Sequence, residues 1–117
     1  LILSQIAALK RPEGNMKILA IEREVPHIDP LAFTPELLRA EALCAWKLYQ
    51  EGVVRELYFR ADRTEAVLIL ECAHVEEAAA TLDTLPLVQA GLVAFDLMPL
   101  KAYPGFARLF GSLDSEP

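Results

Sequence analysis

Three side chains in one short segment have the types and the spacing that a proton-transfer site needs. Glu56, Tyr58 and Arg60 alternate along Val53–Arg60, a run rich in β-branched and aromatic residues that is typical of a strand. Because side chains alternate across a strand, Val54 is expected on the same face as these three. A glutamate can serve as a base, a tyrosine hydroxyl as a neutral donor, and an arginine as a bidentate carboxylate ligand. The alternative is an edge strand whose charges meet water or another subunit.

Five other titratable residues are candidates for the same kind of site. Glu41 falls among apolar residues on its helical wheel, where burial would raise its pKa or require a cationic partner; a subunit contact or a rim position is the alternative. Glu71 and Asp96 interrupt apolar strands and are candidate ligand-binding acids, unless they mark strand ends or a rim. His27 is the second candidate proton carrier, and His74 is a weaker one; solvated loop histidines are the alternative.

The sequence also excludes several classes of function. It contains no Gly-rich phosphate loop, nucleophile elbow or HExxH motif, and Cys44 and Cys72 have no metal-ligand spacing. We therefore expect no metal, no cofactor and two reduced thiols. The 17 acidic and 11 basic residues give a net charge of −6, which argues against nucleic acid or an anionic membrane as partner. Leu1–Leu9 lacks the pattern of a signal peptide, and no apolar run approaches the roughly 20 residues of a membrane span, so we expect a cytoplasmic protein.

Apolar runs and chain breakers predict the elements that position these residues. Thr34, Pro35 and Glu36 are typical of a helix start, and Gly52 ends that helix. A second helix is expected over Val75–Leu85, before Pro86. Strands are expected at Met16–Arg23, Val53–Arg60, Glu65–Cys72 and Leu92–Pro99.

The resulting order is βαββαβ, the ferredoxin-like α+β plan, in which two helices cover one face of a four-stranded antiparallel sheet. We expect a single domain over residues 16–117, with a docking tail from about residue 100. Residues 1–15 are expected to be an appendage, because a polar breaker precedes Met16.

Both faces of three predicted strands are apolar, although two helices can cover only one face. In Met16–Arg23, for example, Ile18 and Ala20 alternate with Leu19 and Ile21. An exposed apolar face of this size is rare in monomers, so a second copy is expected to cover it. We predict a homodimer or higher even oligomer that forms a dimeric α+β barrel.

Several segments resemble the muconolactone isomerase-like family of the dimeric α+β barrel superfamily, over roughly residues 16–104. They are Leu48–Gly52 before the second strand, Val75–Ala78, and Leu82–Leu87 with its Leu-Pro-Leu. The resemblance implies a cavity for a small organic acid or ring. It also implies a proton shift beside a carbonyl without metal or cofactor.

Two functions of different class follow from these observations. The first is a cofactor-independent, isomerase-like enzyme in which Glu56 or His27 carries the proton and Tyr58 and Arg60 orient a carboxylate or carbonyl. The second is a non-catalytic ligand-binding or assembly protein whose barrel interior is filled by aliphatic side chains.

Overall fold

A computed structural model describes residues 14–111 of the chain. The predicted appendage therefore lies outside the described residues, except for residues 14 and 15, and so does the end of the chain after residue 111. The elements are β1 (Met16–Arg23), η1 (Pro30–Ala32), α2 (Pro35–Gln50), β2 (Val54–Phe59), β3 (Ala66–Cys72), α3 (Val75–Leu82), α4 (Pro86–Gln89), β4 (Ala94–Pro99) and η2 (Gly105–Leu109).

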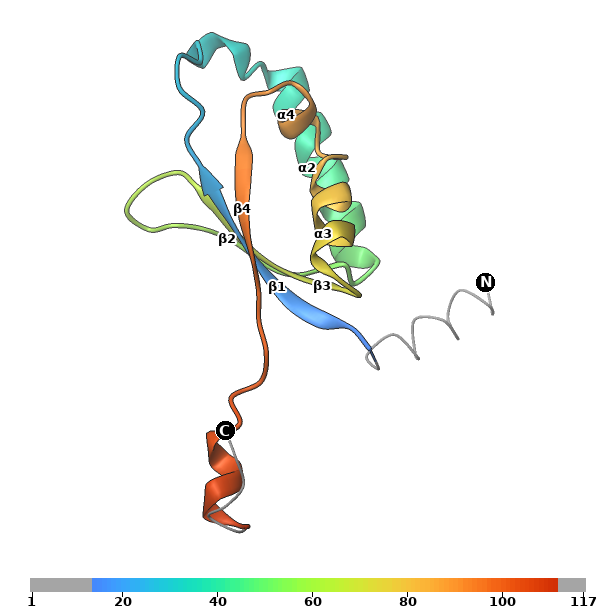
Figure 1. Cartoon of the computed structure of the whole chain (residues 1–117). Coiled ribbons are helices and arrows are strands. Elements are labelled where there is room, and N and C mark those ends of the chain that lie inside the picture. Colours follow the sequence, from blue (N-terminus) through green and yellow to red (C-terminus); the bar gives the residue numbers. More distant parts are fainter. Residues whose placement is uncertain (1–13, 112–117) are drawn as a thin grey trace, which may run out of the picture.

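The four strands form one antiparallel sheet in the order β2-β3-β1-β4. Helices α2, α3 and α4 all lie on the same side of this sheet (Figure 1). The α+β class and the four-stranded antiparallel sheet are confirmed, and the arrangement is consistent with a ferredoxin-like fold.

The second predicted helix begins at Val75 as expected but ends three residues early, at Leu82, and a further short helix that was not predicted, α4, follows at Pro86–Gln89. Helix α3 ends at Leu82, and Leu85 has an extended backbone (φ −71°, ψ 130°) before α4 begins at Pro86. A proline disfavours a helical conformation in the residue before it and cannot continue a helix, whereas it is well suited to the first position of a new one.

Helix α2 begins and ends where its sequence predicts. The Thr34 hydroxyl oxygen accepts a hydrogen bond from the Leu37 amide at 3.2 Å, and Pro35 occupies the first turn. After the helix, Gly52 has a φ of +80°, which a residue with a side chain rarely adopts. This turn brings the chain directly into β2.

The hydrophobic core lies between the sheet and the helices. Its largest fully buried side chains are Ile18 of β1, Val54 of β2, and Leu70 and Cys72 of β3, and Ala78 and Leu82 of α3 cover them. Every second residue of β3 is buried, as expected for a strand with one face on a core.

The predicted faces of the second strand need a correction. Val54 pairs with Leu70, but Glu56 pairs with Ile69, because a β-bulge lies between them. The extra residue of a bulge changes the face on which the following side chains lie. Val54 therefore shares the helix-covered face with Leu57, while Glu56 and Tyr58 lie on the opposite face.

Within residues 14–111, no helix covers that opposite face, which we call the open face (Figure 1). Its centre is apolar, and ion pairs flank it: Lys17 and Arg55 reach Glu71 at 3.4 and 3.7 Å, and Arg23 reaches Asp96 at 3.0 Å. The paired strands place Leu19, Ile21, Val67, Ile69 and Met98 at this centre. Among residues 14–111, none of the helices is both long and apolar enough to cross a membrane.

Replacing Leu70 with alanine tests the position of the core. Leu70 has no exposed surface, so its truncation should lower the free energy of unfolding by about 2–5 kcal/mol in urea titrations. The matched control is Leu43→Ala on the outer side of α2, where the side chain is 54% exposed and the change should be small. Equal losses in both variants would contradict this core.

Candidate functional site

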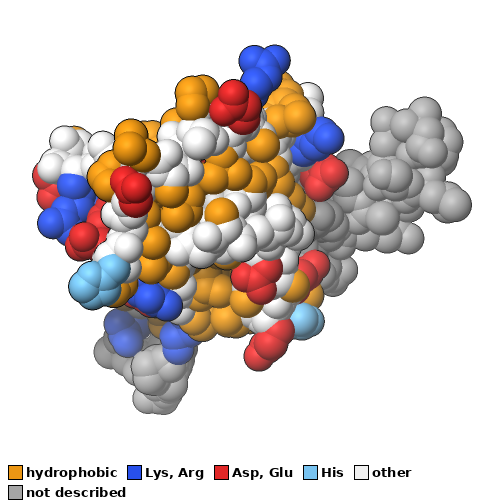
Figure 2. Space-filling view, turned by 90° about the horizontal axis from the view of Figure 1, so that it is seen from above, with side chains coloured by type: hydrophobic (Ala, Val, Ile, Leu, Met, Phe, Trp, Pro, Cys, Tyr) orange, Lys and Arg blue, Asp and Glu red, His pale blue; other side chains and the backbone are white. Residues whose placement is uncertain are grey.

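A largely apolar cavity lies between α2 and the helix-covered face of the sheet, and its volume is about 450 Å³. This size falls within the range of small-molecule sites. Its apolar wall comes from α2, from the sheet and from the α3–α4 segment: Leu38, Ala42, Ala45, Leu48, Val54, Leu57, Phe59, Ala66, Leu68, Leu85, Leu87, Val93 and Phe95. Seen from above, hydrophobic side chains gather over this end of the molecule and charged ones lie mostly at its margin (Figure 2).

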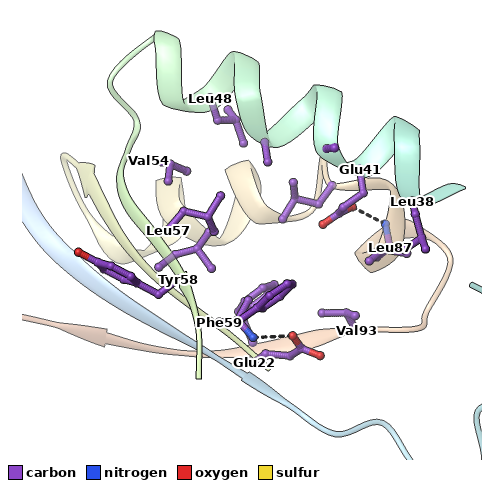
Figure 3. A pocket seen from close by; sticks show the side chains of 16 residues that line it. Glu22, Leu38, Glu41, Leu48, Val54, Leu57, Tyr58, Phe59, Leu87 and Val93 are labelled. Carbon is purple, nitrogen blue, oxygen red and sulfur yellow. Dashed lines mark hydrogen bonds between the residues drawn. The ribbon is translucent and has the colours of Figure 1, made fainter. Parts of the chain in front are cut away.

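Glu41 reaches into this cavity from α2 (Figure 3). One carboxylate oxygen accepts a hydrogen bond from the Leu87 amide of α4 at 2.9 Å, which fixes the side chain between the two helices. Burial raises the pKa of Glu41. The hydrogen bond from Leu87 opposes that shift, and the negative charge of Glu22 adds to it. Glu41 thus faces inward, as its position on the helical wheel predicts.

Glu22 is the second acid of the cavity, and it comes from the sheet. It lies near the end of β1, where its carboxylate accepts a hydrogen bond from the Ala66 amide at 2.8 Å (Figure 3). Burial raises the pKa of Glu22, the hydrogen bond from Ala66 opposes this, and the charge of Glu65 raises it further. The sequence analysis did not single out Glu22. Its position could have been predicted, because alternate side chains of a strand share a face and Glu22 follows Ile18 and Ala20, which point toward the core.

Together the two carboxyl groups form an acid-base pair in an apolar site. Each uses one oxygen to accept a backbone amide, which leaves the other oxygen for a bound molecule. Burial raises the pKa of both groups, and the negative charge of Glu22 raises that of Glu41 further. Such a pair can remove a proton at one position of a ligand and return one at another.

The cavity offers no positive charge to a ligand. Within residues 14–111, the side chains that line it include no Lys, Arg or His, and Tyr58 is their only polar member besides the two acids. Figure 3 shows the Tyr58 ring pointing away from the cavity. An anionic ligand would therefore meet two acids and no cation.

The structure brings two of the predicted site residues together on the open face rather than in this cavity. The Tyr58 hydroxyl donates a hydrogen bond to the Glu56 carboxylate at 2.9 Å, and both side chains are exposed. This hydrogen bond raises the pKa of Tyr58. Glu56 and Tyr58 also border a second hollow at the outer edge of β2.

Arg60 and His27 lie outside the cavity wall. Arg60 contacts Asp62 through two hydrogen bonds of 2.9 and 2.6 Å and lies 3.5 Å from Glu65, so the β2–β3 connection holds its guanidinium. His27 is exposed in the loop before α2 and has a φ of +63°. Neither residue lines the cavity that holds Glu41.

The remaining predicted residues have local roles. Glu71 and Asp96 form the ion pairs at the margins of the open face. The His74 ring accepts a hydrogen bond from the Glu77 amide at 3.1 Å and so caps α3. In the part of the chain that the structure describes, no group of three or more His, Cys, Asp or Glu residues is placed to hold a metal ion.

No protein-family model matches this chain, and no curated protein matches it. Inference about function therefore rests on the geometry of the cavity and on the chemistry of its residues.

The Glu41→Gln variant tests the electrostatics of the site through stability. A carboxyl whose folded pKa is raised binds protons more tightly in the native state, so it weakens stability as the pH rises through the unfolded and then the folded pKa. At pH 8 the variant should be more stable than the original chain by on the order of 0.5 kcal/mol, because solvent screens a half-buried group. At pH 3.5 the difference should vanish.

Urea unfolding at both pH values measures this effect. Glu24→Gln, in the exposed segment after β1, is the matched control, and it should show no such pH-dependent gain. At each pH the comparison is between Glu41→Gln and the original chain. If the substitution lowers the free energy of unfolding more at pH 8 than at pH 3.5, the assigned burial is wrong.

Proposed function

We propose that the chain is a cofactor-independent small-molecule enzyme in which Glu41 and Glu22 move a proton within the cavity under α2. The observation that carries this proposal is the pair of half-buried carboxyl groups, each with a raised pKa, in an otherwise apolar space of about 450 Å³. Carboxyl groups with a pKa moved toward neutrality are suited to act as acid and base at physiological pH.

Glu41 is the better candidate for the group that keeps its proton. The charge of Glu22 raises the pKa of Glu41, whereas Glu65 is the charged neighbour that raises the pKa of Glu22. Ionised Glu22 would take a proton from a carbon beside a carbonyl, and the Glu41 carboxyl would hydrogen-bond the oxygen of the resulting enolate. Return of a proton from a carboxyl group to a different carbon completes an isomerisation with no change of oxidation state.

The substrate class follows from the charge of the wall. The resemblance implies a small organic acid or a ring as the ligand. Glu22, Glu41 and the apolar lining of the cavity favour the second of these, as an uncharged ring that carries a carbonyl. This proposal moves the proton carrier from Glu56 or His27 to Glu41 and Glu22. It also keeps the isomerase-like reaction that the resemblance implies, and membership of the muconolactone isomerase-like family stays a prediction.

Isomerisation of 3-cyclohexenone to the conjugated 2-cyclohexenone tests the reaction class, because the product absorbs in the near ultraviolet. The full chain should accelerate it, and Glu41→Gln should reduce the rate by about 10² or more, as expected for loss of a general acid or base. Glu56→Gln is the matched control on the opposite sheet face and should retain the rate. Equal loss in both variants, or no acceleration at all by the original chain, would contradict the proposal.

The alternative function, a non-catalytic assembly protein, is favoured by the open face. An apolar centre with ion pairs at its margins has the composition of a surface between subunits. We therefore include a homodimer, joined through this face as a dimeric α+β barrel, in the proposal. Dimerisation through the open face is compatible with catalysis in the cavity, because the cavity lies on the other side of the sheet.

Native mass spectrometry of Ile69→Lys tests the shared open face. The original chain should form an even multimer, and the variant should have a lower subunit number, because a charge would be buried without a partner. Leu31→Lys changes an equally apolar side chain on η1, which is 82% exposed, and should leave the assembly intact. A monomeric original chain would contradict the barrel.

A further inference from the structure

The C-terminal arm, residues 100–111, is the most exposed apolar segment that the structure describes. The Leu100 amide still donates to the Lys17 carbonyl at 2.9 Å, and beyond it the chain leaves the sheet and runs away from the domain (Figure 1). Its large apolar side chains are all exposed, up to 87% for Phe110: Leu100, Tyr103, Phe106, Leu109 and Phe110. So much apolar surface on a projecting segment indicates a docking function.

The arm has a defined local structure. The rings of Tyr103 and Phe106 meet edge to face, with centroids 5.1 Å apart. Gly105 is buried beneath the Tyr103 ring, so closely that an added Cβ would clash with it. Two of the arm's aromatic rings, Tyr103 and Phe106, are therefore held against each other before binding, which lowers the entropic cost of docking them.

A matching surface lies at the opposite edge of the sheet. We call it the α2–β2 groove: a hollow of about 530 Å³ lined by Ala42, Ala45, Trp46, Tyr49, Arg55, Glu56, Leu57 and Tyr58. The Trp46 and Tyr49 rings are stacked with centroids 5.9 Å apart, and both are about half exposed. Beside the groove, β2 is a terminal strand of the sheet, so its outer edge can accept a further strand.

The arm and the groove are complementary in two respects. In residues 14–111, all exposed aromatic side chains belong to one or the other except Phe59. The charged residues of the arm, Lys101 and Arg108, are both basic, whereas residues 14–99 contain 14 acidic and 7 basic residues. An apolar, basic arm thus fits an aromatic groove on an acidic domain.

A second copy of the chain is the occupant that this geometry favours. The arm begins at β4, and the groove adjoins β2, so the two lie at opposite edges of the order β2-β3-β1-β4. The arm also points away from its own sheet (Figure 1). When two copies exchange arms, the arm of each copy covers the α2–β2 groove of the other. Such a reciprocal contact closes into a symmetric assembly.

We propose that residues 100–111 of one copy dock in the α2–β2 groove of a second copy and complete the wall of its cavity. The groove and the cavity share the lining residues Ala42, Ala45, Leu57 and Tyr58. A docked arm therefore covers the side of α2 and β2 on which the cavity borders the groove. This inference concerns assembly and does not depend on the proposed proton transfer.

The fluorescence of Trp46 tests the proposal, because it is the only tryptophan in the sequence and it lies in the groove. In the full chain, raising the protein concentration should shift its emission to shorter wavelength and reduce acrylamide quenching severalfold. The variant Phe106→Ser with Phe110→Ser should keep Trp46 exposed at every concentration. Leu31→Ser, which removes an exposed side chain on η1, should behave like the original chain.

Cross-linking identifies which chain supplies the arm. A photoreactive phenylalanine at position 106, in an equal mixture of ¹⁴N and ¹⁵N chains, should give mixed-isotope cross-links to residues 42–58. Cross-links within one chain, cross-links to another surface, or none would overturn the proposal. A Trp46 emission that does not change with concentration, or that is the same in the double arm variant, would overturn it as well.

Discussion

The rest of the site depends on one constraint, which is the free-energy cost of removing two carboxyl groups from water beneath α2. Glu41 and Glu22 lie in an apolar space, and one backbone amide at 2.8–2.9 Å holds each of them. A single neutral donor offsets only part of the lost hydration, so burial still raises both pKa values. A fully aliphatic site would be more stable. The pair is therefore best understood as chemistry that the fold holds in place at some cost to stability.

Much of the fold could be predicted from local signals. The Thr34-Pro35-Glu36 start of α2 fixed its first turn, and the apolar runs gave four strands close to their observed positions. The site was harder to predict, because the bulge between Val54 and Glu56 depends on pairing with β3. Without the bulge, Glu56 would lie on the same face as Val54, as expected. Glu41 could be found from its helical wheel, but Glu22 at the polar end of a strand resembled an ordinary strand boundary.

The two faces of the sheet differ in what they contact. The helix-covered face provides the core around Leu70 and, where α2 stands away from the sheet, the cavity. The open face has an apolar centre bordered by ion pairs, which suits contact with a second copy. The C-terminal arm exposes its aromatic side chains instead of packing them on its own sheet, which suits a contact at the edge strand of a second copy (Figure 1). In the proposed assembly, the docked arm and the cavity meet at the α2–β2 groove.

The most direct test of the central claim is a ¹³C NMR titration of the glutamate side-chain carboxyl carbons in the full chain, with Glu41→Gln and Glu22→Gln used for assignment. We predict that Glu41 and Glu22 titrate above the usual range of a glutamate. We also predict that replacing Glu22 with Gln lowers the pKa of Glu41, because a neighbouring negative charge is removed. If both groups titrate in the usual range of a glutamate, the acid-base pair does not exist.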